Sequence, residues 1–217
     1  FRADYLGVRA ADDILDRFAG INRTFPVALQ LGAAAPLGAK LAAGDAAAKL
    51  GALLTCDPVE PIARQASQAG AFVAEEERLP LAPASLDLVV SIGGLQWTND
   101  LPRALAGIRA ALKPDGLFLG ALVGGASLAE LREAFLAAEA ELEGGASPRV
   151  APMVDVRDLG RLLQGAGFAL PVVDVDRVTV TFTSPFELLW DLRAMGATNI
   201  LWERKRMPLR RATLMRA

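Results

Sequence analysis

The chain has 217 residues, of which 53% are hydrophobic, and a formal net charge of −2. This composition excludes a disordered chain and is enough for one α/β domain with a sizeable core. There is no histidine and only one cysteine, Cys56, which excludes a Ser-His-Asp triad, a histidine-based metal site and an internal disulfide. We expect Cys56 to be buried in a strand, no metal to be bound, and no transmembrane segment, since no apolar run is long enough to cross a bilayer.

The charge is unevenly distributed along the chain. Residues 203–217 hold six basic residues and one acid, which leaves 17 basic and 24 acidic residues for the remainder. An acidic body does not suit nonspecific nucleic-acid binding, so no nucleic-acid partner is expected. The basic end fits either an acidic partner or a solvated helix face.

Hydrophobic periodicity predicts alternating helices and strands through residue 123. Helices are expected over residues 3–19, 35–50, 61–68 and 101–112. Strands are expected over residues 27–31, 52–56, 71–74, 86–92 and 117–123, with a turn at 113–116 before the last of them. The order predicts a doubly wound, mostly parallel α/β sheet.

The sequence after residue 123 predicts a helical insertion and C-terminal helices. Helices are expected over 128–142, 155–164, 185–194 and 201–216, and a sixth strand over 172–182. The alternation of that strand changes parity near Asp176, which predicts a bulge. We expect a single domain over 1–217, with a cofactor-binding half at 26–123 and with the final strand missing. Trp190 and Trp202 are expected to be packing residues.

Residues 27–40 have the layout of a buried strand, a turn at Gly32 and a helix, which is typical of the nucleotide-binding opening of such a sheet. Only one glycine stands at the turn, and Ala34 and Pro36 follow it. The methyl group of Ala34 disfavours positive φ and close backbone approach, and Pro36 lacks an N–H. The pattern predicts a cofactor site with an atypical loop.

Four segments resemble class I S-adenosylmethionine-dependent methyltransferases. Asp57 ends the second strand, where that superfamily places an acid against the ribose hydroxyls. Residues 75–80 (EEERLP) are similar to the acid-rich loop that lies against the adenine. The other two segments are 85–91 (SLDLVVS), similar to the fourth strand, and 112–118 (LKPDGLF), similar to the turn into the fifth.

Two further segments, 95–102 and 144–168, resemble the branch that contains mitochondrial complex I assembly factor 5 and its bacterial relatives. Acyl-carrier-protein malonyl methyltransferases of biotin synthesis are cousins of that branch. The resemblance implies a bacterial, cytoplasmic protein that uses S-adenosylmethionine to methylate a small-molecule or protein acceptor. The alternatives are a catalytically impaired assembly or interaction protein, and an arginine hydroxylase-like factor acting on a respiratory complex I subunit.

The resemblance also implies the site residues, although no catalytic residue can be named. The cofactor would be held by Gln30, Gly32, Ala34, Asp57, Pro58, Glu75, Glu76 and Ser91, with Trp97 at the substrate pocket. Gln30 stands where the family has an acid, so the charge that complements the methionine ammonium is lost. Simpler readings stay open: Asp57 as a helix N-terminal acid, Glu75 and Glu76 as a solvated loop, and Trp97 as core.

Overall fold

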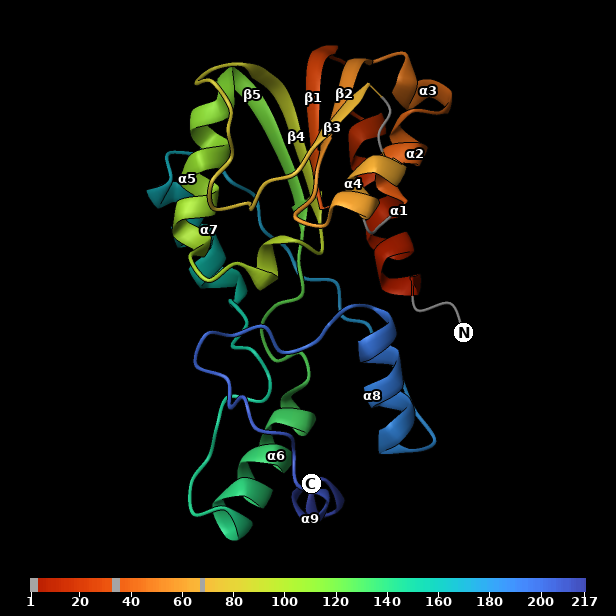
Figure 1. Cartoon of the computed structure of the whole chain (residues 1–217). Helices are drawn as coiled ribbons and strands as arrows, with labels where there is room; N and C mark the ends of the chain where they lie inside the picture. The colour runs from red at the N-terminus through yellow and green to blue at the C-terminus, as the bar shows by residue number, and fades with distance from the viewer. Residues whose placement is uncertain (1–3, 33–35, 67–68) are drawn as a thin grey trace. The chain divides into compact units, whose positions relative to one another are not determined.

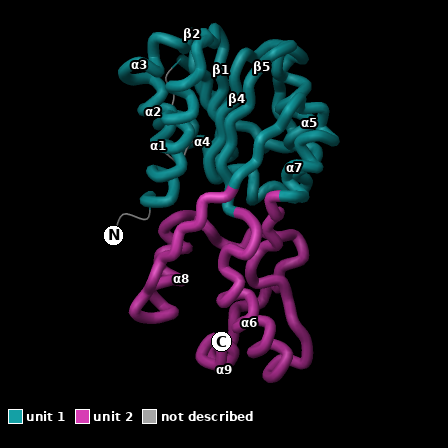
Figure 2. The backbone as a smooth tube through the Cα atoms, turned by 180° about the vertical axis from the view of Figure 1, so that it is seen from behind, with its two compact units in different colours: residues 1–123, 157–174 teal, residues 124–156, 175–217 magenta. Residues whose placement is uncertain are grey.

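The computed structural model describes residues 4–32, 36–66 and 69–217. Within it the chain divides into two compact units. Unit 1 comprises residues 1–123 and 157–174, and unit 2 comprises residues 124–156 and 175–217 (Figure 2). The single domain expected from the sequence stays a prediction.

Unit 1 is built on a five-stranded sheet with the strand order β3-β2-β1-β4-β5, in which every pairing is parallel (Figure 1). The strands are β1 (Phe25–Leu31), β2 (Leu50–Cys56), β3 (Gly70–Phe72), β4 (Leu86–Ile92) and β5 (Leu112–Ala121). Every residue of β4 is buried, because this apolar strand lies next to the sheet centre with helices on both faces. The predicted parallel α/β sheet is therefore confirmed.

The helices of unit 1 cover both faces of the sheet. They are α1 (Tyr5–Ala19), α2 (Leu37–Leu41), α3 (Gly44–Ala47), α4 (Glu60–Ala66), α5 (Leu101–Ala111) and α7 (Val156–Gly165). On one face, Phe18 of α1 and Leu37 of α2 join the core that includes Leu88. On the other, Ile108 of α5 and Leu163 of α7 join the core around Leu29. This two-sided packing is the doubly wound arrangement expected from the sequence.

A buried carboxylate fastens three strands at the amino end of the sheet. Asp87 of β4 accepts a hydrogen bond from the Val27 N–H of β1 at 2.9 Å and two from Lys113 Nζ of β5 at 3.0 Å. Burial raises the pKa of Asp87, but these hydrogen bonds and the Lys113 charge lower it by more than burial raises it. The pKa of Asp87 therefore lies below its ordinary value. The contact fixes the edge of the sheet opposite to the strand ends expected to bind a cofactor.

Two predicted boundaries in unit 1 are wrong. The single helix expected over 35–50 is instead the two short helices α2 and α3, separated near Gly44, whose φ of +58° interrupts the helix. Pairing with Phe25 then draws Leu50 into β2, which places Gly51 inside the strand. The turn expected at 113–116 is a bulge within β5, because Leu86 pairs with Leu112 while Leu88 pairs with Leu117.

Replacing Gly51 by alanine is expected to lower the free energy of unfolding by about 1–3 kcal/mol. A Cβ on Gly51 would lie 2.3 Å from the Pro26 carbonyl oxygen, so the backbone of β1 or β2 would have to move. Urea denaturation followed by circular dichroism measures the loss. Gly107→Ala on α5 is the matched control: its Cβ meets nothing within 4 Å, and alanine there should stabilise by about 0.5–1 kcal/mol. Equal effects of the two substitutions would contradict the close contact.

Unit 2 is helical, with α6 (Ala129–Leu142), α8 (Pro185–Ala194) and α9 (Arg211–Arg216). α8 begins as predicted, since Ser184 Oγ accepts from the Glu187 N–H at 3.3 Å and Glu187 in turn accepts from the Thr183 N–H. The helix expected over 201–216 is shortened to α9, because Pro208 cannot continue a helix. No helix among the residues described has both the length and the hydropathy to span a bilayer.

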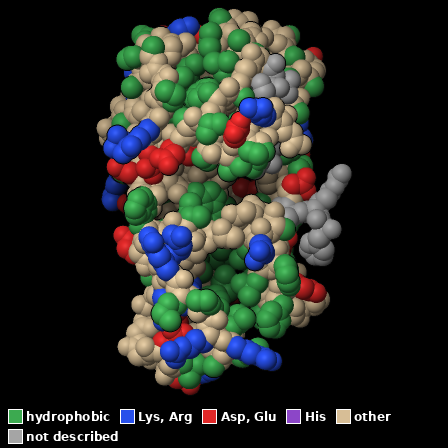
Figure 3. Space-filling model, viewed as in Figure 1, with side chains coloured by type: hydrophobic (Ala, Val, Ile, Leu, Met, Phe, Trp, Pro, Cys, Tyr) green, Lys and Arg blue, Asp and Glu red, His purple; other side chains and the backbone are tan. Residues whose placement is uncertain are grey.

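Two tryptophans of unit 2 lie on the surface. Trp190 of α8 is 69% exposed and Trp202 is 73% exposed, so the prediction that both are packing residues is wrong. Trp202 stands on irregular backbone rather than in the helix expected over 201–216. Figure 3 shows hydrophobic side chains on the surface in the part of the molecule formed by unit 2.

The predicted sixth strand over 172–182 is wrong, since the structure has no regular secondary structure there. The segment passes from unit 1 to unit 2 after Asp174, which is bound to Arg17 of α1 at 2.8 Å. A strand requires a neighbour to accept and donate its backbone hydrogen bonds. Among the described residues, none of the five strands pairs with this segment.

Candidate functional site

Two glycine turns meet where β1 and β4 end. Gly32 has φ of +74°, and its N–H donates to the Cys56 carbonyl oxygen at 2.9 Å. A Cβ on Gly32 would lie 3.4 Å from the Ile92 carbonyl oxygen and 3.6 Å from Gly94 Cα. The backbones of the two strand ends therefore approach each other closely, which forms a cradle that a Cβ would begin to fill.

The sequence prediction included Gly32 but missed Gly93 and Gly94. Gly93 has φ of +69°, a conformation that favours glycine. The signal was present, because a pair of glycines directly after a buried strand indicates close backbone approach.

Gln30 lies completely buried at the end of β1 and supports the turn beneath Gly32. Its Nε2 donates to the Gly32 carbonyl oxygen at 3.1 Å, and its Oε1 has no hydrogen-bond partner within the described part of the chain. Oε1 faces α2, where a Cβ on Gly38 would lie only 2.1 Å away. The Gln30 side chain thus lies between the turn and the helix. Ala34 lies outside the described residues, and Pro36 directly precedes α2.

Asp57 follows β2 and is buried at the same edge of the sheet. Its Oδ1 accepts a hydrogen bond from the Val59 N–H at 2.8 Å, which forms a turn ahead of α4. The adjacent Pro58 is exposed. The contact supports the simpler interpretation of Asp57 as a helix N-terminal acid. Ribose binding stays a prediction that is compatible with it, because a carboxylate accepts several hydrogen bonds.

Glu76 extends the site toward the end of β4. A Cβ on Gly94 would lie 3.0 Å from Glu76 Oε1, so this half-buried carboxyl group faces the glycine cradle. Burial raises its pKa, and the carboxylates of Asp57, Glu77 and Glu75 raise it further. The carboxyl group therefore binds a proton more readily than an exposed glutamate does.

The neighbours of Glu76 have different surroundings. Glu75 is exposed, whereas Glu77 accepts hydrogen bonds from the N–H groups of Asn99 and Asp100. Cys56 is buried as expected, and burial together with the Glu76 charge raises the pKa of its thiol to about 12. Of the two glutamates predicted to contact a cofactor, only Glu76 faces the cradle.

Three buried polar atoms near the glycine turns lack hydrogen-bond partners in the structure as described: Gln30 Oε1, Ser91 Oγ and Gln96 Oε1. Ser91 is 1% exposed and stands one residue before the end of β4. Gln96 belongs to the short helix η1 (Leu95–Trp97), and its Nε2 donates to the Gly93 carbonyl oxygen at 2.9 Å. Buried polar atoms are normally hydrogen-bonded, so this edge of the sheet is equipped to bind a polar ligand.

Trp97, predicted for the substrate pocket, lies half-buried in η1. Its backbone N–H donates to the Gly94 carbonyl oxygen at 3.0 Å. It therefore stands directly after the glycine cradle, and both its predicted roles stay open. The described residues contain no group of three or more histidine, cysteine, aspartate or glutamate side chains that could hold a metal ion.

The comparisons with known proteins agree with the fold described above. A family model described as a methyltransferase domain matches residues 29–120, which run from the last three residues of β1 through β4 to nearly the end of β5. A chain of the solved complex between the Haloferax volcanii Trm112 methyltransferase activator and a methyltransferase has a similar fold, with a TM-score of 0.56 and 15% identity. That match covers 90% of this chain and 94% of the other. The fold is that of a class I methyltransferase.

Two curated relatives show to which branch of the methyltransferase-fold proteins this chain is similar. The mitochondrial arginine-hydroxylase NDUFAF5 of Homo sapiens is 41% identical over 99% of this chain and 62% of its own length. The malonyl-[acyl-carrier protein] O-methyltransferase of Xylella fastidiosa (strain M23) is 43% identical over 58% of this chain and 41% of its own length. This chain belongs to the methyltransferase-fold family of these proteins, as its sequence indicated. It spans about 62% of the human relative.

Proposed function

We propose that this protein binds S-adenosylmethionine at the carboxyl ends of β1, β2 and β4 and transfers its methyl group to an acceptor. The observation that carries the proposal is the cradle between Gly32 and Gly94, next to Ser91, whose buried Oγ has no hydrogen-bond partner among the described residues. Glycine backbone that can be approached closely, next to a buried polar atom, suits a nucleoside ligand. Membership of the methyltransferase family supports the choice of ligand.

The residues present fit this cofactor in defined roles. Asp57 would accept hydrogen bonds from the ribose hydroxyls, Glu76 would lie at the adenine, and Gly32 would let backbone approach the methionine part. Gln30 and Ser91 would supply further hydrogen bonds there. Pro58 and Glu75 would form the outer border of the site, and Trp97 would border the acceptor.

When bound, the cofactor supplies a methyl group on a positively charged sulfonium. The protein contributes alignment, because holding the acceptor nucleophile close to that methyl group removes much of the entropic barrier. A dedicated base is not required for this contribution. The neutral Gln30 cannot complement the methionine ammonium group by charge, so we expect weaker binding than an acid at this position would give.

Calorimetry with S-adenosylmethionine and S-adenosylhomocysteine tests the proposal. We expect saturable one-to-one binding by the unmodified protein and its loss in Gly94→Val, whose side chain would fill the cradle and press on Glu76. Gly107→Ala, whose Cβ meets open space, serves as the control and should bind normally. Absence of binding by the folded, unmodified protein at millimolar ligand would overturn the proposal.

A second candidate is an assembly or interaction protein for a respiratory complex, or an arginine hydroxylase-like factor. It is favoured by the neutral Gln30 at the cofactor loop and by the similarity to the human arginine-hydroxylase NDUFAF5. Mass spectrometry of candidate partner subunits separates the reactions, since methylation adds one methylene unit and hydroxylation adds one oxygen atom. If those subunits show neither of the two mass changes, both enzymatic readings are removed for them.

A further inference from the structure

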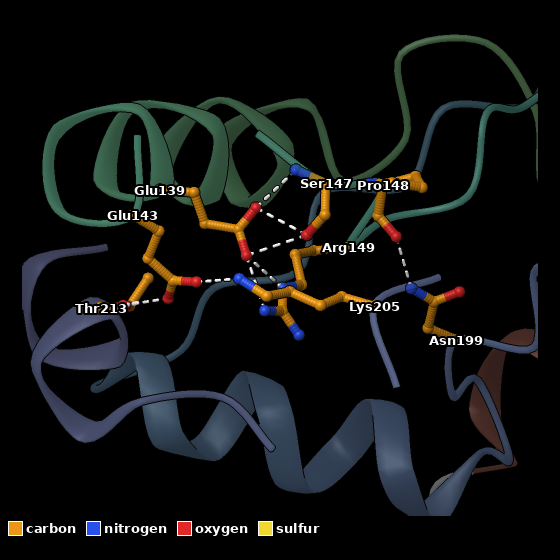
Figure 4. A network of polar contacts seen from close by, with 8 residues as sticks. All are labelled: Glu139, Glu143, Ser147, Pro148, Arg149, Asn199, Lys205 and Thr213. Carbon is orange, nitrogen blue, oxygen red and sulfur yellow. Dashed lines mark hydrogen bonds and ion pairs between the residues drawn. The ribbon is translucent and has the colours of Figure 1, made fainter. Parts of the chain in front are cut away.

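Carboxylates in both units accept hydrogen bonds from the backbone of a neighbouring segment. In unit 2, Glu139 of α6 accepts from the Ser147 N–H at 2.6 Å (Figure 4). In unit 1, Glu77 accepts from the N–H groups of Asn99 and Asp100, the latter at 3.0 Å. The contact of Glu139 lies within unit 2, whereas that of Glu77 lies beside the proposed cofactor site.

Glu77 completes the capping of α5 from another part of the chain. Asp100 is the N-cap residue of α5, and its side chain accepts from the Arg103 N–H at 3.0 Å. In a capping box, a Glu or Gln at the position of Arg103 would accept in return from the N–H of the N-cap residue. An arginine side chain carries donors only and cannot do so. Glu77 supplies this acceptor from 23 residues earlier, and its negative charge suits the positive end of the helix dipole.

Glu76 and Glu77 lie at the centre of one turn, and their side chains have different surroundings. The Arg78 N–H closes the turn by donating to the Glu75 carbonyl oxygen at 2.9 Å. Glu77 binds the residues at the start of α5, whereas Glu76 Oε1 lies 3.0 Å from the position of a Cβ on Gly94. Because the two glutamates are adjacent, fixing Glu77 restricts where Glu76 can point.

Glu76 occupies a position that an unrestrained carboxylate would leave for water. Burial raises its pKa, the hydrogen bond from its own backbone N–H lowers it by less, and the carboxylates of Asp57, Glu77 and Glu75 raise it further. Cys56, buried at the end of β2, is close enough that the Glu76 charge contributes to the raised pKa of its thiol. These surroundings disfavour the charged form of Glu76, so its position depends on contacts that hold the turn.

We propose that Glu77 is a positioning residue: by binding the start of α5, it holds the Glu76 carboxyl group at the glycine cradle. The inference deepens the proposed function, on which its cofactor-binding test rests. Glu77 would touch neither cofactor nor acceptor and would act through the turn. The same contact ties the acidic turn to the segment that carries Trp97, on the proposed acceptor side. A site whose groups are held in place before the ligand arrives loses less conformational entropy on binding.

Substitution of Glu77 should leave the fold intact, because apolar contacts hold the rest of the segment. Leu79 and Leu81 pack against the core of unit 1 that includes Leu95. The side chain of Asp100 still caps α5. Loss of Glu77 should therefore loosen the turn and the start of α5 without unfolding the sheet, and circular dichroism checks this.

Glu77→Ala and Glu77→Gln separate the hydrogen bonds from the charge. Both substitutions remove the negative charge, but glutamine keeps an oxygen that accepts from Asn99 and Asp100. In calorimetry with S-adenosylhomocysteine, the dissociation constant should rise about tenfold or more in Glu77→Ala and stay within about threefold in Glu77→Gln. Arg78→Ala, which shortens an exposed side chain of the same turn, is the matched control and should bind normally.

A titration of the Glu76 carboxyl group, followed by carbon-13 NMR, gives a readout that a loss of stability alone would not change. Removing the Glu77 charge should lower the pKa of Glu76 in both variants. In Glu77→Ala the carboxyl group should also move into water, so its pKa should fall further, to near that of an exposed glutamate. Hydrogen exchange of the Asn99 and Asp100 amides should be faster in Glu77→Ala than in Glu77→Gln.

The two readouts distinguish failure of the inference from failure of the proposed function. Equal titration of Glu76 in Glu77→Ala and Glu77→Gln, or equal affinity of these two variants for S-adenosylhomocysteine, would contradict the positioning role. If the unmodified protein binds no S-adenosylhomocysteine, the proposed function fails. The Glu76 titration then still decides whether Glu77 holds that carboxyl group at the glycine cradle.

Discussion

Replacing Glu139 by alanine is expected to destabilise unit 2 by about 3–5 kcal/mol. Glu139 lies on α6 with no exposed surface, and accepts hydrogen bonds from the Ser147 N–H at 2.6 Å, Ser147 Oγ at 2.7 Å and Arg149 Nε at 2.6 Å. The substitution would leave the guanidinium of Arg149, which is 14% exposed, without its anion. Removing one partner of a buried pair costs far more than the pair contributes. Hydrogen exchange of peptides covering residues 129–150 measures the loss locally.

Glu141→Ala on the same helix is the matched control. Glu141 pairs with Arg216, but both side chains are more than half exposed, so its loss should cost about 1 kcal/mol or less. The double variant Glu139→Met/Arg149→Met removes both charges and should recover much of the stability lost in Glu139→Ala. If Glu139→Ala and Glu141→Ala had equal effects, the buried pair would not hold the 144–150 segment on α6.

The pH dependence of unit 2 follows from the same carboxylate. Burial raises the pKa of Glu139, but the hydrogen bonds from Ser147 and Arg149 lower it more, and the pKa lies below the ordinary value of 4.5. A group whose pKa is lowered by folding stabilises the folded state above its unfolded pKa. The stabilisation should therefore be present at neutral pH and fade below about 4.5 as the pH falls through the lower folded value. Glu139→Gln should lack this part of the acid sensitivity.

Substitution of Asp57 is expected to weaken S-adenosylhomocysteine binding in two steps. Asp57→Asn keeps an oxygen that can accept from the Val59 N–H but loses the charge, and the dissociation constant should rise about tenfold. Asp57→Ala loses both the charge and the acceptor, and the dissociation constant should rise about 100-fold. Calorimetry measures both variants.

Glu60→Gln is the control for charge alone, because Glu60 is an exposed acid in the first turn of α4. It should bind as the unmodified protein does. Wild-type affinity in Asp57→Asn would indicate that Asp57 only forms the turn ahead of α4. The ribose role would then be rejected even if the protein binds the cofactor elsewhere along the strand ends.

The central strand was the easiest element to predict, and the reason is physical. Residues 86–92 are apolar apart from Asp87 and Ser91, so their pattern fits a strand buried on both faces, and β4 has the predicted bounds. The alanine-rich stretch 35–50 was harder, because helix propensity favours alanine everywhere along it. Pairing of β2 with β1 overrides that preference from Leu50 onward.

The site shows where sequence reasoning reaches its limit. The positions of Asp57 and Ser91 at strand ends follow from the order of elements, and the structure places both at the carboxyl edge. Residue type alone could not show that Gln30 turns its Oε1 toward Gly38. The same holds in unit 2, where α6 periodicity located Glu139 but gave no sign that Ser147 and Arg149 fold back onto it. Such contacts depend on loop paths that carry no periodic signal.

The place of β1 between β2 and β4 has a consequence for synthesis on the ribosome. β2 is complete at Cys56, whereas the other neighbour of β1, β4, is complete only at Ile92. At ordinary elongation rates, roughly 2–7 s separate the emergence of the two partners. During that interval one edge of β1, with its apolar side chains, has no strand beside it, and such an edge can pair with other chains. The glycine cradle, which needs both β1 and β4, is therefore completed only after this exposed stage of the nascent chain has passed.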